Sequence, residues 1–265
     1  MERFVGRVRK CLQEYHMIQR DDVVAVGVSG GKDSLALLAA LHALRPYYPE
    51  PFELQAVTLD MGFPGMDLDP VGEYCARLGI PWRKERTELY RLIFEERREE
   101  NPCALCSRMR RAALCDLARR SGAGKLALAH GFDDAVETFL MSLVFEGRLH
   151  CFDPVTVYDG VTVIRPMLYA GESAAVNAAR ELELPVVKSA CPMDGHSRRA
   201  EMKELAAELS RQYPGFKSRV FGAMQRLPLY GWGVAEPGRE DKTGNKTTSQ
   251  DRQNTENGQK QQDLC

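Results

Sequence analysis

Residues 23–34 read VVAVGVSGGKDS, and this stretch decides the fold that the sequence predicts. Five of its first six residues are apolar, which is typical of a short buried strand in a parallel sheet. A glycine-rich turn follows, and the Leu- and Ala-rich residues 35–44 have helical spacing. The order strand, glycine turn, helix directs backbone N–H groups and a helix N-terminus toward an anion. It predicts a phosphate site in which Lys32 adds a positive charge, while Ser29 and Ser34 donate hydroxyl hydrogen bonds.

The glycine turn does not match a Walker A loop. That motif requires glycine five residues before Gly31, where the chain has Val26, and Ser or Thr after the lysine, where it has Asp33. The string SGGKDS resembles instead the PP-loop of ATP pyrophosphatases, which cleave ATP between the α and β phosphates and adenylate a substrate. The resemblance implies an ATP site made of Ser29, Gly30, Gly31, Lys32, Asp33 and Ser34. The alternative is a tight strand-to-helix turn with an incidental lysine.

Composition limits the classes of protein that fit. A chain of 265 residues is long enough for one domain with appendages. Its 36 basic and 37 acidic side chains nearly balance, so a phosphate-rich partner must be met by local patches and not by the overall field. No apolar run reaches the length of a signal peptide or a membrane span. We therefore expect a cytoplasmic protein that does not associate with membranes.

Strand-like and helix-like segments alternate along most of the chain. After a helix within 2–18, strands are predicted at 23–28, 53–59, 81–87, 125–130 and 161–164, with helices at 67–78 and 89–100. This alternation predicts the α/β class, as a doubly wound parallel sheet. The expected organisation is an N-terminal helix (1–20), an ATP-binding domain (21–190), a small helical C-terminal extension (191–235) and a disordered tail (236–265).

Acidic side chains follow two of the predicted strands. Asp60 ends the strand at 53–59, and ligands of open α/β sheets bind at such carboxyl ends. His130, Asp133 and Asp134 follow the strand at 125–130. An Asp pair there is suited to hold Mg²⁺ against ATP phosphates, because Mg²⁺ takes carboxylate and substrate oxygens together. The alternative is plain capping of the helix that follows.

Eight cysteines in a chain of this class argue against a disulfide framework. Most are expected to be small core residues or chance thiols, but Cys103 and Cys106 have the spacing of metal ligands. A thioredoxin-type role is disfavoured, because the pair does not follow the first strand of a βαβ unit. Cys191 stands apart, just after the predicted sheet domain. Three thiolates suit a cubane cluster with one open iron, whereas the addition of His196 would close a tetrahedral zinc site.

Arginines cluster in three places. Arg108, Arg110 and Arg111 follow the cysteine pair, and Arg198 and Arg199 lie in the segment 188–226, in which eight basic residues outnumber four acidic ones. These groups suit the phosphate backbone of a nucleic acid, so they are candidate tRNA-binding residues. Arg165 follows the last predicted strand and is placed to pair with a phosphate or an acid; a buried structural ion pair is equally compatible with that position.

Taken together, these motifs resemble the tRNA 2-thiocytidine synthetase (TtcA-like) family of PP-loop ATP pyrophosphatases. The matching pieces lie within residues 20–195 and comprise SGGKDS, LD with GFP, CxxCSR with RR, HxxDD and RP. One departure is the absence of a second Cys-x-x-Cys, because Pro192, Met193 and Asp194 follow Cys191. A cluster with three cysteine ligands needs only one from this region.

The resemblance implies an adenine-nucleotide hydrolase-like sheet and ATP-dependent tRNA thiolation. Such enzymes adenylate C2 of a cytidine at tRNA position 32 and replace its oxygen with sulfur from a cysteine desulfurase. It implies ATP, Mg²⁺ and a 4Fe-4S cluster as cofactors, tRNA as the partner and a homodimer as one possible assembly. The implied catalytic residues are Lys32, Asp33, Cys103, Cys106 and Cys191, the last three as cluster ligands. Asp60, His130, Asp133 and Asp134 complete the implied ATP site.

Two alternatives to this interpretation remain at the level of sequence. One is another PP-loop tRNA-modifying enzyme of the thiouridine or lysidine type; lysidine synthesis needs no metal, so the cysteine pair argues against it. The other is a non-catalytic nucleotide-binding or redox-sensing protein that keeps the PP-loop. Pyrophosphate release that depends on RNA separates an enzyme from such a sensor.

Overall fold

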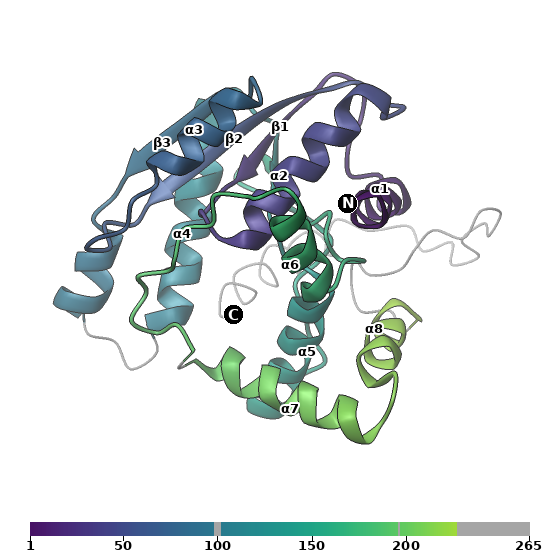
Figure 1. Cartoon of the computed structure of the whole chain (residues 1–265). Helices are drawn as coiled ribbons and strands as arrows, with labels where there is room; N and C mark the ends of the chain where they lie inside the picture. Colours follow the sequence, from purple (N-terminus) through teal and green to yellow (C-terminus); the bar gives the residue numbers. More distant parts are fainter. Residues whose placement is uncertain (98–101, 196, 227–265) are drawn as a thin grey trace, which may run out of the picture.

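Strand β1 (Asp22–Gly27) lies inside the sheet on which the whole chain is built (Figure 1). The computed structural model describes residues 1–97, 102–195 and 197–226. In this part of the chain six strands form one sheet in the order β3-β2-β1-β4-β6-β5. The other strands are β2 (Phe52–Asp60), β3 (Trp82–Arg86), β4 (Lys125–Ala127), β5 (Val155–Tyr158) and β6 (Val161–Ile164). The predicted α/β fold is confirmed, with all neighbouring strands parallel except β5 and β6.

The prediction of an all-parallel sheet is wrong at one edge. Strand β5 pairs antiparallel with β6 and was not predicted. The two are joined by Asp159 and Gly160, whose φ angles of 47° and 78° are both positive, as hairpin turns of two residues require. The sequence VTVYDGVTVI carries this signal, because Asp-Gly separates two alternating runs.

Helices cover both faces of the sheet, as the doubly wound prediction requires. They are α1 (Glu2–Glu14), α2 (Lys32–Leu44), α3 (Asp69–Arg77), α4 (Pro102–Arg120), α5 (Phe132–Glu146), α6 (Glu172–Glu181), α7 (Arg198–Gln212) and α8 (Phe216–Arg226). Successive residues of a strand point to opposite faces. Val24 and Val26 therefore enter the core with α1, α2 and α5, whereas Ala25 packs in a second core with Leu117 of α4.

Several predicted boundaries differ from the structure. The first helix ends at Glu14, and β4 ends at Ala127 because the chain turns there toward α5. The predicted helix over 89–100 appears as a π-helical segment, η2 (Arg91–Arg97), and 98–100 lie outside the described residues. So do the predicted tail at 236–265 and the last part of the extension. The described part of the C-terminal extension is helical. The ring centre of Phe221 in α8 lies 5.0 Å from the ring centre of Phe132. None of the described helices is long and apolar enough to cross a membrane.

A glycine sets the distance between α3 and β3. Gly72 of α3 faces the ring of Trp82, and a Cβ at this position would lie 2.7 Å from Cε3 of that ring. The ring cannot turn aside freely, because its Nε1–H donates a hydrogen bond of 2.8 Å to Thr58 in β2. The close approach of helix and sheet therefore depends on the missing side chain.

We expect Gly72→Ala to destabilise the protein by about 1–3 kcal/mol, because it overpacks the contact with Trp82. Gly6→Ala is the matched control, since Gly6 also lies in a helix but has open space around its Cβ position. There the gain in helix propensity should stabilise the protein by about 0.5–1 kcal/mol. Urea unfolding measures the change in the free energy of unfolding for both variants, which should have opposite signs. Equal changes in the two variants would contradict the packing argument.

Candidate nucleotide pocket and thiol site

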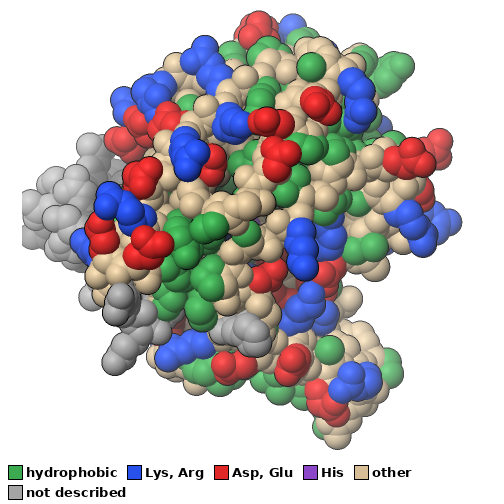
Figure 2. All heavy atoms as spheres, turned by 60° about the vertical axis from the view of Figure 1, so that its left-hand side comes forward, with side chains coloured by type: hydrophobic (Ala, Val, Ile, Leu, Met, Phe, Trp, Pro, Cys, Tyr) green, Lys and Arg blue, Asp and Glu red, His purple; other side chains and the backbone are tan. Residues whose placement is uncertain are grey.

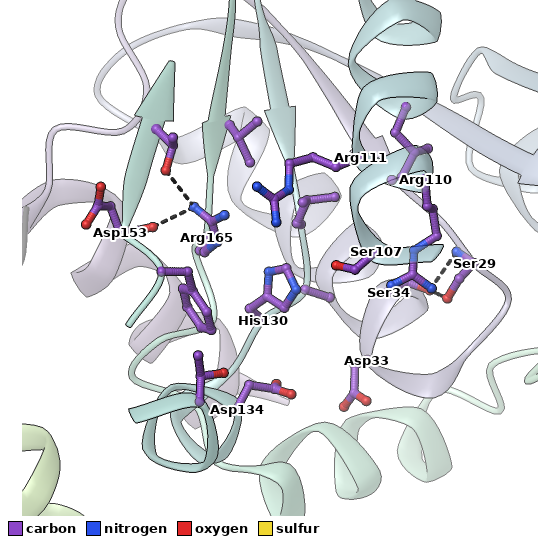
Figure 3. Close-up of a pocket in the computed structure, with 18 of the residues that line it drawn as sticks. Ser29, Asp33, Ser34, Ser107, Arg110, Arg111, His130, Asp134, Asp153 and Arg165 are labelled. Atoms are coloured by element: carbon purple, nitrogen blue, oxygen red, sulfur yellow. Dashed lines mark hydrogen bonds between the residues drawn. The ribbon is translucent and has the colours of Figure 1, made fainter. Parts of the chain in front are cut away.

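A cavity of about 380 Å³ opens at the carboxyl ends of β1, β4 and β6. Parallel strands bring their following loops to the same edge, and the strand order reverses between β1 and β4. Ser29, His130 and Arg165, which follow these three strands, all line the cavity (Figure 3). The sequence predicted that the ends of the first and fourth predicted strands meet at the ATP site, and the structure adds Arg165 to this edge.

The PP-loop forms one side of the cavity. The Ser34 hydroxyl accepts a hydrogen bond of 3.1 Å from the Ser29 backbone N–H and donates one of 2.9 Å to the Gly31 carbonyl. Gly30 has a φ of 85°, which L side chains rarely adopt, and its carbonyl accepts from the Val187 N–H at 2.9 Å. The loop leads directly into α2, so the first N–H groups of this helix lie beside the cavity. This is the geometry of a phosphate site.

Lys32 lies outside the main cavity. Its Nζ contacts Asp33 at 2.8 Å and Glu172 of α6 at 3.4 Å. Burial opposes the charge of Lys32, but the two carboxylates outweigh that effect and raise its pKa. Asp33, in contrast, lines the cavity. The predicted phosphate-binding lysine is thus charged and held beside the loop by an acidic pair.

The two predicted acidic residues after β4, Asp133 and Asp134, make different contacts. Asp133 accepts hydrogen bonds from Lys217 at 2.6 Å and from the Glu172 N–H at 2.7 Å, and it does not line the main cavity. Asp134 lines it, although one of its oxygens also caps α5 by accepting from the Gly131 N–H at 2.8 Å. Both the capping interpretation and the ligand interpretation are therefore compatible with Asp134.

A smaller cavity of about 70 Å³ adjoins these carboxylates. Asp33 and Asp134 line both cavities. Glu137, one turn further along α5, lines the smaller one and is almost fully buried. Burial raises the pKa of Glu137 to about 7, and the charge of Asp134 adds to this effect. Cationic side chains already pair with these carboxylates, since Lys32 lies 2.8 Å from Asp33 and Arg199 lies 3.3 Å from Asp134. Mg²⁺ takes such oxygens together with phosphate oxygens, so it would bind here in place of these side chains.

Four guanidinium groups line the main cavity. Arg110 and Arg111 come from α4 and Arg165 from the end of β6 (Figure 3), and Arg199 comes from α7. Burial and the charges of these arginines hold the pKa of His130 well below its usual range, so its imidazole is neutral. On the face shown in Figure 2, by comparison, Lys and Arg side chains alternate with Asp and Glu. The positive charge suited to phosphates is concentrated inside the pocket.

Besides Lys32 and Asp133, further predicted site residues do not line this cavity. Asp60 caps the turn after β2, where its Oδ1 accepts from the Gly62 N–H at 2.9 Å. Arg198 is exposed, with its guanidinium 5.0 Å from the centre of the Phe145 ring. Arg108 does not line the cavity, unlike its neighbours Arg110 and Arg111.

The three candidate cysteines come together from distant parts of the chain. Cys103 and Cys106 lie in the first turns of α4, and Cys191 lies between α6 and α7; all three are partly exposed. Burial raises the pKa of Cys103 and Cys106, and the charge of Cys191 raises both further. The other four described cysteines, Cys11, Cys75, Cys115 and Cys151, are buried.

The arrangement of these thiols bears on the kind of metal that fits. Within the described residues, no three His, Cys, Asp or Glu side chains are close enough to hold a single metal ion. In a cubane each thiolate binds a different iron, so the ligands stand further apart than around one zinc ion. The charge of Cys191 influences the pKa of Cys103 and Cys106, which places the three thiols in one region, and the cluster that they would hold stays a prediction. His196, the possible fourth zinc ligand, lies outside the described residues.

Sequence reasoning missed part of the pocket wall. Phe152, Asp153 and Thr156 line the cavity from the segment leading into β5, and Ser107 lines it from α4. The first three were missed because β5 itself was not predicted. The Asp-Gly hairpin signal would have placed them at the sheet edge.

Comparisons with known proteins agree with this geometry. The family model described as PP-loop domain matches residues 2–209. A protein from Pelobacter propionicus named tRNA-cytidine(32) 2-sulfurtransferase is 40% identical over 225 residues, which cover 83% of this chain and 84% of the relative. A protein of the same name from Geobacter sulfurreducens is 39% identical over 84% of this chain and 89% of its own length.

A solved structure shares the fold and a related chemistry. It is the U34-tRNA thiolase NcsA from Methanococcus maripaludis with its 4Fe-4S cluster, at a TM-score of 0.69 and 25% identity over 84% of this chain and 78% of that one. The family model, the relatives and the pocket lead to the same assignment. The chain belongs to the PP-loop family and, within it, to the family of the tRNA-cytidine(32) 2-sulfurtransferases.

Proposed function

We propose that this protein thiolates tRNA, using ATP to activate C2 of cytidine 32 and replacing the oxygen there with sulfur. The observation that carries the proposal is one face of α4. Cavity-lining Ser107, Arg110, Arg111 and Leu114 follow Cys103 and Cys106 at helical spacing. The rise of 1.5 Å per residue separates Cys106 from Arg111 by about 7.5 Å along the axis. A thiol site and a nucleotide pocket thus lie on one rigid element.

The pocket supports activation by adenylation. The PP-loop N–H groups and the guanidinium groups of Arg110 and Arg199 bind the phosphates of ATP, and Asp33 and Asp134 hold Mg²⁺ beside them. The cytidine O2 attacks the α phosphorus, its new bond to phosphorus forms, and pyrophosphate leaves with the electrons of the broken α–β bridge. Enclosure of the reacting groups protects the activated base from water.

The thiol site supports the sulfur step. Cys103, Cys106 and Cys191 would hold a 4Fe-4S cluster. The charge of Arg110 favours the thiolate forms of Cys103 and Cys106, since it lowers their pKa against the effect of burial. When bound, such a cluster supplies a site for the sulfur that replaces the oxygen. The sulfur has to come from a donor such as a cysteine desulfurase. A tRNA substrate and unpaired thiols suit the cytoplasm.

A second candidate is thiolation of a uridine. It is favoured by the structural likeness to the U34-tRNA thiolase NcsA, which extends over 84% of this chain. The relatives named for cytidine 32 are more similar in sequence, at 40% and 39% identity against 25%. Mass spectrometry of nucleosides from tRNA treated with the enzyme distinguishes 2-thiocytidine from thiouridine.

We expect Lys32→Ala to reduce RNA-dependent pyrophosphate release about 100-fold or more, because the lysine neutralises phosphate charge in the transition state. Lys203→Ala is the matched control, since Lys203 also pairs with Glu172, at 2.8 Å, but lies in α7 and not at the PP-loop. It should keep a rate close to that of the wild type. Equal losses in both variants would assign the effect to Glu172 and contradict a role for Lys32 at the phosphates.

Single replacement of Cys103, Cys106 or Cys191 by Ser should abolish cluster binding and tRNA thiolation, because each would supply one of three ligands. Iron and acid-labile sulfide, measured after anaerobic reconstitution, provide the readout. Cys115→Ala is the control within α4, since Cys115 is buried in the second core and does not line the cavity. Stoichiometric zinc in anaerobically prepared protein, or full iron content in the Cys191 variant, would contradict the ligand set.

A further inference from the structure

Arg165 is the most deeply buried charged side chain of the pocket, with 3% of its surface exposed. Its Nη1 donates hydrogen bonds to the Asp153 carbonyl at 2.5 Å and to the Thr156 hydroxyl at 3.2 Å. Its guanidinium also lies 4.9 Å from the centre of the Phe152 ring. These contacts hold the group in one orientation and use one of its three nitrogens.

The other edge of this guanidinium has no partner of matching charge in the described chain. Nε is buried and makes no hydrogen bond, and neither of the two hydrogen bonds above involves Nη2. Among the described residues the acceptors of Arg165 are a carbonyl and a hydroxyl, so the buried ion pair that the sequence left open does not form there. A buried N–H group without an acceptor costs about 1–3 kcal/mol. The Nε–Nη2 edge is also the edge that binds two oxygens of one anion side by side.

A second guanidinium adds positive charge to the same chamber. Arg111 lines the cavity from α4, opposite the sheet (Figure 3). Burial, together with the charge of Arg111, lowers the pKa of Arg165 to about 10. The carboxyl of Asp153 compensates weakly, because burial raises its pKa to about 6. An anion between the two arginines would remove both the repulsion and the unmet hydrogen-bonding capacity.

We propose that Arg165 and Arg111 form a second phosphate site, at the end of the pocket away from the PP-loop. Figure 3 shows Arg165 on one side of the cavity and Ser29 and Ser34 on the other, with His130 between them. The chemical class is a nucleotide phosphate, since apolar side chains beside the arginines give a base a surface to contact. These are Leu114, Leu128, Tyr158 and Val163. The inference rests on the proposed function in taking the pocket as a nucleotide site.

Two sources can supply this phosphate, and one variant separates them. Arg165→Lys keeps the charge but removes the two-pronged edge. Its binding to α,β-methylene-ATP with Mg²⁺ and to an anticodon stem-loop RNA is measured by calorimetry. Loss of one charged hydrogen bond should weaken the binding of whichever ligand supplies the phosphate about tenfold. If only the binding of the ATP analogue weakens, the site belongs to ATP. If only the binding of the RNA weakens, the site belongs to the tRNA backbone.

Arg77→Lys is the matched control, because Arg77 also lies over an aromatic ring, that of Tyr74, but on the exposed face of α3. It should bind both ligands as the wild type does. Arg111→Lys tests the site from the opposite wall, so the experiment stands even if Arg165→Lys does not fold. Arg111→Lys should weaken binding of the same ligand that Arg165→Lys affects.

Unchanged binding of both ligands in Arg111→Lys and in folded Arg165→Lys would overturn the second phosphate site and leave the proposed function intact. A wild-type protein that binds neither the ATP analogue nor the RNA would overturn both. The two failures are therefore distinguishable, since the first appears only in the difference between variant and wild type.

Discussion

Burial of β1 on both faces is the constraint on which the rest of this molecule depends. Val24, Ala25 and Val26 are inaccessible to solvent, because helices cover the sheet from both sides. After Asp22 at its first position the strand carries no polar side chain, so binding groups appear only where it ends. Its parallel neighbour β4 ends at the same edge, and β6 follows. The PP-loop, His130 and Arg165 converge for that reason.

Charge in the resulting pocket is arranged for anions on one side and for a cation on the other. Guanidinium groups from three elements line the main cavity, while Asp33 and Asp134 lie between it and the smaller one. Such groups repel one another in a poorly solvated site, as the neutral His130 and the raised pKa of Glu137 show. Nucleotide phosphates with Mg²⁺ would neutralise both sets of charges together.

Helix α4 joins the two chemistries of the proposed reaction. Cys103 and Cys106 begin a stripe that continues through Arg110 and Arg111 into the cavity. A helix is rigid over this distance, so the separation of the thiols from the nucleotide is set by residue spacing and not by loop motion. Cys191 reaches the same place from a segment beyond α6, which ties the C-terminal helices to the site.

The sequence by itself determined the α/β class, the PP-loop and the residue types of the thiol site. These features depend on local order: an apolar strand, a glycine turn and a helix follow one another within residues 23–44. Local order also contained the β5–β6 hairpin, whose Asp159–Gly160 turn was overlooked. Only the tertiary structure decided which members of each motif face the ligand. Asp133 pairs with Lys217, 84 positions away, whereas the adjacent Asp134 lines the pocket. Arg199 enters the cavity, but Arg198 lies over Phe145. Neighbouring residues on a helix point about 100° apart, and contacts from distant segments select between them; such contacts leave no trace in residue spacing.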